Sequence, residues 1–234
     1  MKIRKNIPNF FTSLNLLAGC FGIVAISQNS PREATMFIIA GAVFDFFDGF
    51  FARSLKAGSA FGKEFDSLAD MITFGLLPAF FMYFLFIENA SGYYPYLSFL
   101  IALAAGLRLA RFNINDDQKE NFIGLPTPAN AFLVVGLVNI YLADWESFRY
   151  VFNDPNILMA VVFIMAILMN SKIQFISLKF TTSGWKGNKY RYIVIATGTV
   201  LIIFLHFQGI FFAMFFYLII SMYRHFLLFL RPAS

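Results

Sequence analysis

Residues 45–70 read DFFDGFFARSLKAGSAFGKEFDSLAD. The stretch contains four aspartates: Asp45, Asp48, Asp66 and Asp70. The first two are three residues apart and the last two are four apart, and both spacings place side chains on one face of a helix. Apolar residues flank the stretch, at 41–44 and 71–74. A carboxylate at the centre of a membrane helix costs about 2.5–3.5 kcal/mol on insertion scales, so these aspartates indicate a functional site.

The four carboxylates predict a metal site. Like charges gathered in one pocket repel each other, and a divalent cation reverses that repulsion. Ligation by oxygen alone, without His or Cys, suits hard ions such as Mg²⁺, Mn²⁺ or Ca²⁺. The alternative is that the aspartates cap helices and pair with neighbouring cations, namely Arg53, Lys56 and Lys63. The repeated spacing favours the metal site over this alternative.

The stretch fits the pattern D-x2-D-G-x2-A-R-x8-G-x3-D-x3-D, and it resembles the signature of the CDP-alcohol phosphotransferase family. All eight fixed positions match: Asp45, Asp48, Gly49, Ala52, Arg53, Gly62, Asp66 and Asp70. The resemblance implies an all-α membrane fold of the family type. It also implies that an alcohol attacks a CDP-linked phosphate, that CMP leaves, and that the four aspartates hold two divalent cations, Mg²⁺ or Mn²⁺.

The resemblance also implies roles for single residues. Asp70 would be the general base as well as a metal ligand. The residues expected to bind the CDP-linked lipid are Asn9, Thr12, Gly49, Ala52, Arg53 and Gly62. Arg53 suits phosphate because its guanidinium presents forked donors. The alternative for Asn9 and Thr12 is helix capping, and the alternative for the small residues Gly49 and Ala52 is helix packing.

Further stretches resemble the membrane-integral phosphatidylserine synthase branch of the family: residues 8–15, 66–75, 107–113 and 122–128. This resemblance implies CDP-diacylglycerol and L-serine as substrates. The competing acceptors are glycerol 3-phosphate and inositol phosphate. Serine brings a carboxylate that needs a cation, so we expect Arg108, Arg111 and Asn113 to bind it. The alternative is that both arginines anchor their helix at lipid headgroups.

Composition identifies the class of protein. The chain has 234 residues, of which 59% are hydrophobic and 13% charged, whereas soluble domains carry about 25% charged residues. We therefore predict one integral-membrane domain over residues 1–234. The net charge of +5 is explained by basic cytoplasmic loops rather than by binding of nucleic acid. The single cysteine, Cys20, permits no intrachain disulfide.

Apolar runs and breaks predict about eight transmembrane helices. The first three cover residues 9–27, 32–53 and 62–87. The fourth follows Pro95 and ends near Arg111, and the fifth starts after Pro128 and ends near Ala143. The last three cover residues 155–170, 192–206 and 209–223, with a weak break at 207–209. Residues 171–191 are basic and contain an apolar patch (Ile173, Phe175, Ile176, Leu178 and Phe180), which predicts either a membrane-surface segment or an ordinary loop.

Eight helices put both termini on one side of the membrane. With these boundaries, that side carries all Lys and Arg residues except Arg32 and Arg149. The positive-inside rule makes this side cytoplasmic, so we expect the active site and both termini in the cytoplasm, and the protein in the bacterial cytoplasmic (inner) membrane among membrane lipids. Dimers are common in the family, so we expect a homodimer.

Two alternatives concern the class of protein and the first helix. A cation transporter would also hold intramembrane carboxylates, but its expected inverted repeats and broken helices are not seen in the sequence. The basic start and apolar run resemble a signal peptide with a cleavage site at residues 25–27. Because Asn9, Thr12 and Asn15 interrupt that run, we expect it to be a retained membrane helix.

Overall fold

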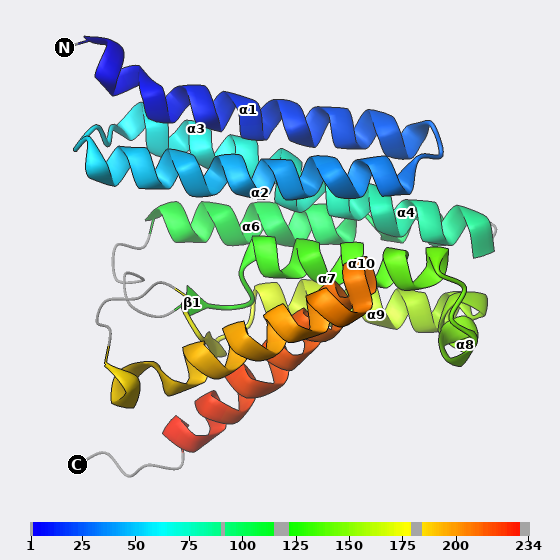
Figure 1. The fold of residues 1–234 in the computed structure, drawn as a ribbon. Coiled ribbons are helices and arrows are strands. Elements are labelled where there is room, and N and C mark those ends of the chain that lie inside the picture. The colour runs from blue at the N-terminus through cyan, green and yellow to red at the C-terminus, as the bar shows by residue number, and fades with distance from the viewer. Residues whose placement is uncertain (1, 90–91, 115–121, 179–183, 230–234) are drawn as a thin grey trace.

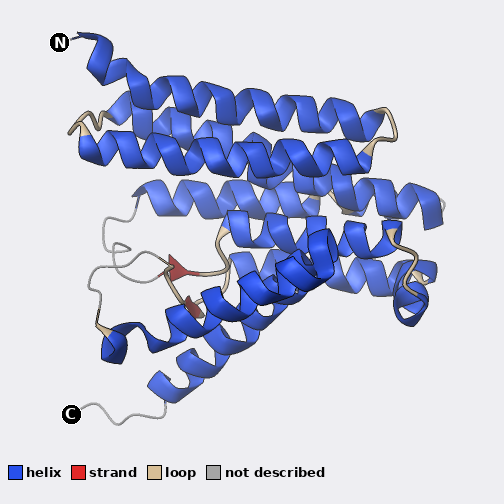
Figure 2. Ribbon diagram, in the orientation of Figure 1, coloured by secondary structure: helices blue, strands red, loops and turns tan. Residues whose placement is uncertain are grey.

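The computed structural model describes residues 2–89, 92–114, 122–178 and 184–229. Within them the fold is almost entirely helical (Figures 1 and 2). One pair of two-residue antiparallel strands, β1 (Phe122–Ile123) and β2 (Gln174–Phe175), joins two loops at one end of the helical bundle. The prediction of an all-α polytopic membrane protein is confirmed.

The first two helices form an antiparallel hairpin along one side of the molecule (Figure 1). Helix α1 covers Lys2–Ser27 and α2 covers Pro31–Ser54. The connection turns at Asn29, whose φ of 59° lies in the left-handed region that asparagine tolerates. Proline at the first position of α2 suits a helix start because that position needs no N–H donor.

The predicted third helix is continuous from Ala60 to Asn89 but changes geometry within its length. It consists of α3 (Ala60–Asp70), a π-helical segment η1 (Met71–Leu76) and α4 (Leu77–Asn89). A short helix α5 (Tyr94–Leu97) leads into α6 (Leu100–Ile114). No pattern in the sequence predicted the π-helical segment, which directly follows Asp70.

The second half of the chain packs beneath the first (Figure 1). Helix α7 covers Thr127–Leu142, and α9 covers Pro155–Met169 after a short 3-10 turn η2 (Glu146–Phe148) and helix α8 (Arg149–Asn153). The last element, α10 (Trp185–Phe229), contains one residue with non-helical dihedral angles, His206. Its two halves run back along each other, with Gly209 against the backbone of Leu201. The predicted weak break near residues 207–209 is therefore a helical hairpin.

A helix can cross a membrane when it is long and apolar enough. Five helical stretches of the described chain meet this criterion: residues 6–27, 31–54, 60–89, 94–114 and 187–229. The α8–α9 pair, bent by 85°, would be a sixth if counted as one span. The five include α10 as one stretch although it folds back at His206, and α7 is shorter than the criterion requires. All eight predicted helical segments are thus present, but not all are long enough to cross a membrane as straight rods.

Part of the apolar patch within residues 171–191 packs into the core. Phe175 and Ile176 are 0% and 1% exposed, and the Tyr217 hydroxyl donates a hydrogen bond to the Ile176 carbonyl at 3.1 Å. The expectation of a membrane-surface segment is therefore wrong for Phe175 and Ile176, which lie in and directly after β2 where it pairs with β1. Ile173 is half-buried and Leu178 is 43% exposed, so the expectation stays a prediction for them. Phe180 lies outside the described residues.

We expect Gly136→Ala to destabilise the packing of α7 on α10. A Cβ at this position would overlap the backbone nitrogen of Phe211, and overpacking of this kind costs about 1–3 kcal/mol. Thermal unfolding in detergent should show a lower Tm. Gly198→Ala is the matched control, since its Cβ would meet Ala213 at an ordinary 3.4 Å. Equal Tm values for the two variants would contradict the close α7–α10 contact.

Candidate active site

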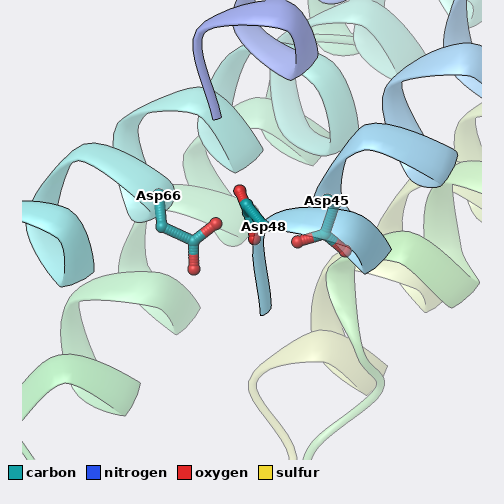
Figure 3. Close-up of side chains that lie close together, drawn as sticks. All are labelled: Asp45, Asp48 and Asp66. Carbon is teal, nitrogen blue, oxygen red and sulfur yellow. The ribbon is translucent and has the colours of Figure 1, made fainter. Parts of the chain in front are cut away.

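Three of the four predicted aspartates converge from two helices. Asp45 and Asp48 lie on α2 and Asp66 lies on α3, and each offers a carboxylate oxygen within 4.8 Å of the other two. Figure 3 shows the Asp66 carboxylate facing the pair on α2. Asp48 is buried, while Asp45 and Asp66 are half-buried. The prediction that the Asp45–Asp48 pair shares a helix face and meets the third helix is confirmed.

The turn between α2 and α3 brings the two helices together. It passes through Lys56, whose φ is 50°. The Ser59 hydroxyl then caps α3 by accepting a hydrogen bond from the Gly62 backbone N–H at 2.9 Å. A serine N-cap of this kind stabilises a helix start. The short, capped turn fixes the position of Asp66 relative to Asp45.

Asp70 is the last residue of α3, and its carboxylate is not among the oxygens that lie within 4.8 Å of one another. It interacts electrostatically with Asp45, Asp66 and Asp48, and its Oδ1 accepts a hydrogen bond from Asn15 Nδ2 at 3.2 Å. The Thr73 hydroxyl, in η1, donates to the Asn15 carbonyl at 2.9 Å. The π-helical segment therefore connects Asp70 to α1, and such segments are frequent at functional sites.

Helix α1 contributes a polar face to the site. The buried Thr12 hydroxyl donates a hydrogen bond to Asp48 Oδ2 at 2.7 Å. The Pro8 carbonyl oxygen, 3.1 Å from the same hydroxyl, is its alternative acceptor. Both Asn9 and Thr12 lie inside α1, which begins at Lys2. The alternative that they cap this helix is therefore wrong. Sequence reasoning placed the helix start too late because the first residues are basic.

The motif's small residues leave room beside polar side chains. A Cβ on Gly49 would lie 3.2 Å from Arg53 Nη1, so the guanidinium lies over this glycine. Arg53 also interacts electrostatically with Asp48. A Cβ on Gly62 would lie 3.2 Å from Asn9 Oδ1. Ala52 is half-buried on α2, the helix of Gly49 and Arg53. These residues border the aspartates on the side where the α2–α3 turn lies.

The donor set fits a divalent metal ion. Hard cations take carboxylate oxygens at about 2.0–2.6 Å, and oxygens no more than 4.8 Å apart can share one ion at such distances. Four carboxylates packed together also repel one another unless a cation lies among them. The arrangement is therefore an acidic site suited to a divalent metal.

The three residues expected to bind serine occupy different surroundings. Arg108 is 7% exposed and interacts electrostatically with both Asp70 and Tyr217. Arg111 is exposed and donates a hydrogen bond to Asn170 Oδ1 at 3.1 Å. Asn113 bonds Ser67 and Glu64 on α3 through its side-chain amide. Arg108 therefore interacts with one of the four aspartates, whereas Arg111 and Asn113 bond groups outside the aspartate cluster.

Two residues of this region were missed by sequence reasoning. Asn15 orients Asp70, and a signal for it existed, because Asn15 follows Thr12 by three residues and so shares its helix face. Tyr217 lies on α10, far along the chain, and interacts with Arg108. Nothing in the local sequence around Tyr217 distinguishes it from the other aromatic residues of α10.

We expect Mg²⁺ or Mn²⁺ to raise the Tm of the purified protein and Asp66→Asn to lose most of that rise. A ligand that binds only the folded state stabilises it by about 2.7 kcal/mol at a hundred times its Kd. Asp154→Asn is the control, because Asp154 caps α9 through the Asn156 backbone N–H and asparagine also caps well. The same metal-dependent shift in both variants would contradict a metal site at Asp66.

Comparisons with known proteins agree with this geometry. The family model for CDP-alcohol phosphatidyltransferase matches residues 5–181. A CDP-diacylglycerol–serine O-phosphatidyltransferase of Helicobacter pylori is 34% identical over 174 residues, covering 74% of this chain and 72% of that protein. The enzyme of the same name from Bacillus subtilis is 34% identical over 173 residues, covering 72% of this chain and 89% of that protein.

A third relative of that name comes from an archaeon. The Methanocaldococcus jannaschii protein is 39% identical over 147 residues, covering 61% of this chain and 67% of that protein. The match to the family model spans well over half of the chain and includes all four aspartates. This chain belongs to the CDP-alcohol phosphatidyltransferase family.

Proposed function

We propose that this protein transfers the phosphatidyl group of CDP-diacylglycerol to the hydroxyl of L-serine, giving phosphatidylserine and CMP. The observation that carries the proposal is the set of named relatives, which share this acceptor across bacteria and an archaeon. The converging aspartates supply the site at which such a transfer takes place.

Two divalent cations, Mg²⁺ or Mn²⁺, complete this site, held by Asp45, Asp48, Asp66 and Asp70. When bound, they neutralise the charge of the diphosphate and so favour phosphoryl transfer. The Thr12 hydroxyl keeps the Asp48 carboxylate in place from α1. The protein's share of the reaction is therefore mainly positioning.

Asp70 acts as the general base. Asn15 donates to its Oδ1 and so orients the carboxylate that accepts the proton of the serine hydroxyl. The serine oxygen forms a bond to the phosphorus that carries the lipid, the bond from that phosphorus to the oxygen of CMP breaks, and CMP leaves. Placement of a base in this way contributes typically 10²–10⁴-fold in rate.

The substrate-binding residues surround the aspartates on two sides. On the CDP-diacylglycerol side we place Asn9, Thr12, Gly49, Ala52, Arg53 and Gly62, with Arg53 at a phosphate. For the serine carboxylate we favour Arg108 over Arg111 and Asn113. Arg108 is buried and interacts electrostatically with Asp70. Arg111 and Asn113 already form hydrogen bonds with other groups.

We also propose that the protein lies in the bacterial cytoplasmic membrane as a homodimer, with its site on the cytoplasmic side. The charge asymmetry of the loops supports this orientation. Helix α1 begins, α10 ends and the α2–α3 turn lies at the same end of the bundle (Figure 1). An exposed apolar stripe along α2 (Met36, Val43, Phe46 and Phe50) offers a surface for the second copy.

The test of the proposed function is a panel of acceptors with purified protein and CDP-diacylglycerol. We expect release of CMP and formation of phosphatidylserine with L-serine, and much slower release with glycerol 3-phosphate or inositol phosphate. Asp70→Asn should lower kcat with serine by about 10²–10⁴-fold, while Asp154→Asn should not. Preference for another acceptor would overturn the serine assignment, and normal turnover by Asp70→Asn would overturn the base assignment.

The proposed orientation is tested by labelling single cysteines in intact cells. In a Cys20→Ala background, a membrane-impermeant thiol reagent should label Gln28→Cys and spare Gly58→Cys. Both positions are exposed and lie at opposite ends of α2, in the turns before and after it. Ser91, another position expected on the outer side, lies outside the described residues. Labelling of position 58 but not 28 would put the aspartates on the wrong side for cytoplasmic nucleotides.

A further inference from the structure

The first turn of α7 contains buried polar atoms without hydrogen-bond partners. Thr127 and Asn130 are 1% and 0% exposed. Among the described residues, neither the Thr127 hydroxyl nor either polar atom of the Asn130 amide has a hydrogen-bond partner. Burying an unpaired amide is costly, and such groups in native structures call for an explanation.

A second asparagine on the same helix shows what a purely structural amide looks like. Asn139, 4% exposed, donates to the Thr35 hydroxyl at 3.0 Å and to the Val135 carbonyl at 2.8 Å. Its amide is satisfied within the protein. The Asn130 amide, equally buried and nine residues earlier in α7, offers its donors and its acceptor to something else.

The register of the helices places this turn at the depth of the active site. The Asn139–Thr35 bond joins α7 to α2, and the two helices run in opposite directions (Figure 1). We count twelve residues from this bond toward the end of the bundle that holds the α2–α3 turn, which is about 18 Å at 1.5 Å per residue. The count leads back to Thr127 in α7 and forward to Phe47 in α2. Phe47 lies between Asp45 and Asp48, so the start of α7 is level with the aspartate pair.

The contact of α7 with α10 places the turn beside the buried arginine. Gly136 packs against the Phe211 backbone, where the second half of α10 crosses α7 obliquely (Figure 1). The Tyr217 ring lies 6.2 Å from that of Phe175 in β2, and β2 pairs with β1, which shortly precedes the first turn of α7. Tyr217 interacts with Arg108, and Arg108 interacts with Asp70. The unpartnered groups thus share one layer with the arginine and the base.

The local backbone holds this turn firmly. Gly124 and Leu125 donate backbone hydrogen bonds to Ile173 and Leu168, both at 2.9 Å. Gly124 has a φ of 76°, and a Cβ there would overlap the Met169 carbonyl. Helix α7 then begins after Pro126 without a side-chain cap. Polar groups that are preorganised in this way bind a ligand with less loss of conformational freedom.

The chemistry of the turn matches a zwitterionic α-amino acid. An uncapped helix N-terminus favours an anion such as a carboxylate. A hydroxyl and an amide provide donors for that carboxylate, and the amide oxygen accepts from an ammonium group. L-serine carries both charged groups one carbon away from its reacting hydroxymethyl group, whereas glycerol 3-phosphate and inositol phosphate carry no ammonium.

We propose that Thr127, Asn130 and the N-terminus of α7 bind the carboxylate and ammonium groups of the acceptor amino acid and so determine acceptor specificity. The assignment rests on the proposed serine transfer. The carboxylate lies between Arg108 and the start of α7, and the ammonium donates to Asn130 Oδ1.

The experiment compares Asn130→Leu and Thr127→Val with the control Asn139→Leu, in detergent with Mg²⁺. We expect Asn130→Leu to raise the KM for L-serine at least tenfold, because a site built to hydrogen-bond its substrate loses a partner. The KM for CDP-diacylglycerol should stay within about twofold of the wild-type value. Thr127→Val, which keeps the side-chain shape, should raise the serine KM in the same direction.

Thermal unfolding separates binding from folding. Without serine, Asn130→Leu should keep or raise the Tm, because it removes an unsatisfied buried amide, whereas Asn139→Leu should lower the Tm and keep the wild-type serine KM. The Thr127→Val variant should also lose preference for L-serine over ethanolamine, which keeps the ammonium group but lacks the carboxylate. Thr127→Val provides the same kinetic comparison should Asn130→Leu not fold.

The outcomes distinguish this assignment from the proposed function. Serine-dependent CMP release by the wild type, together with unchanged serine KM values in Asn130→Leu and Thr127→Val, would overturn the α7 pocket and leave serine transfer standing. An unchanged Thr127→Val would overturn it in the same way if Asn130→Leu did not fold. A wild type that releases no CMP in response to serine would overturn serine transfer and the pocket with it.

Discussion

Repulsion among four carboxylates inside an apolar bundle is the constraint on which the rest of this structure depends. Asp45, Asp48 and Asp66 bring oxygen atoms within 4.8 Å of one another, and Asp70 interacts with all three. Such a cluster is unfavourable by itself, since burial and like charge both oppose ionised carboxylates. The surrounding helices compensate by supplying donors and positive charge, and the site is suited to a divalent cation for the same reason.

The compensating groups come from both sides of the cluster. On one side, α1 supplies Thr12 to Asp48 and Asn15 to Asp70, and Arg53 lies over Gly49. On the other side, Arg108 on α6 interacts with Asp70 and with Tyr217 on α10. The aspartates themselves come from only two helices, so the other elements of the bundle act mainly by holding these donors at the right depth.

Much of the site could be read from the sequence because its ligands are local. Aspartates three and four residues apart must share a helix face, and the turn at Gly58 and Ser59 reverses the direction of the chain between α2 and α3 (Figure 1). Both facts follow from backbone geometry and held in the structure. The helical segments were also predictable, because apolar runs and prolines record them, although α1 begins earlier and α10 folds back at His206.

The sequence by itself determined the family, the membrane class, the aspartate cluster and the order of the helices, since each depends on spacing along one or two neighbouring helices. Only the tertiary structure decided which distant residues meet that cluster. The π-helical segment after Asp70, the burial of Phe175 and Ile176, the interaction of Arg108 with Tyr217 and the unpartnered amide of Asn130 all depend on packing between helices far apart in the chain. No local pattern records such contacts, because in this chain apolar residues cover most faces of the helices and periodicity does not show which face meets which neighbour.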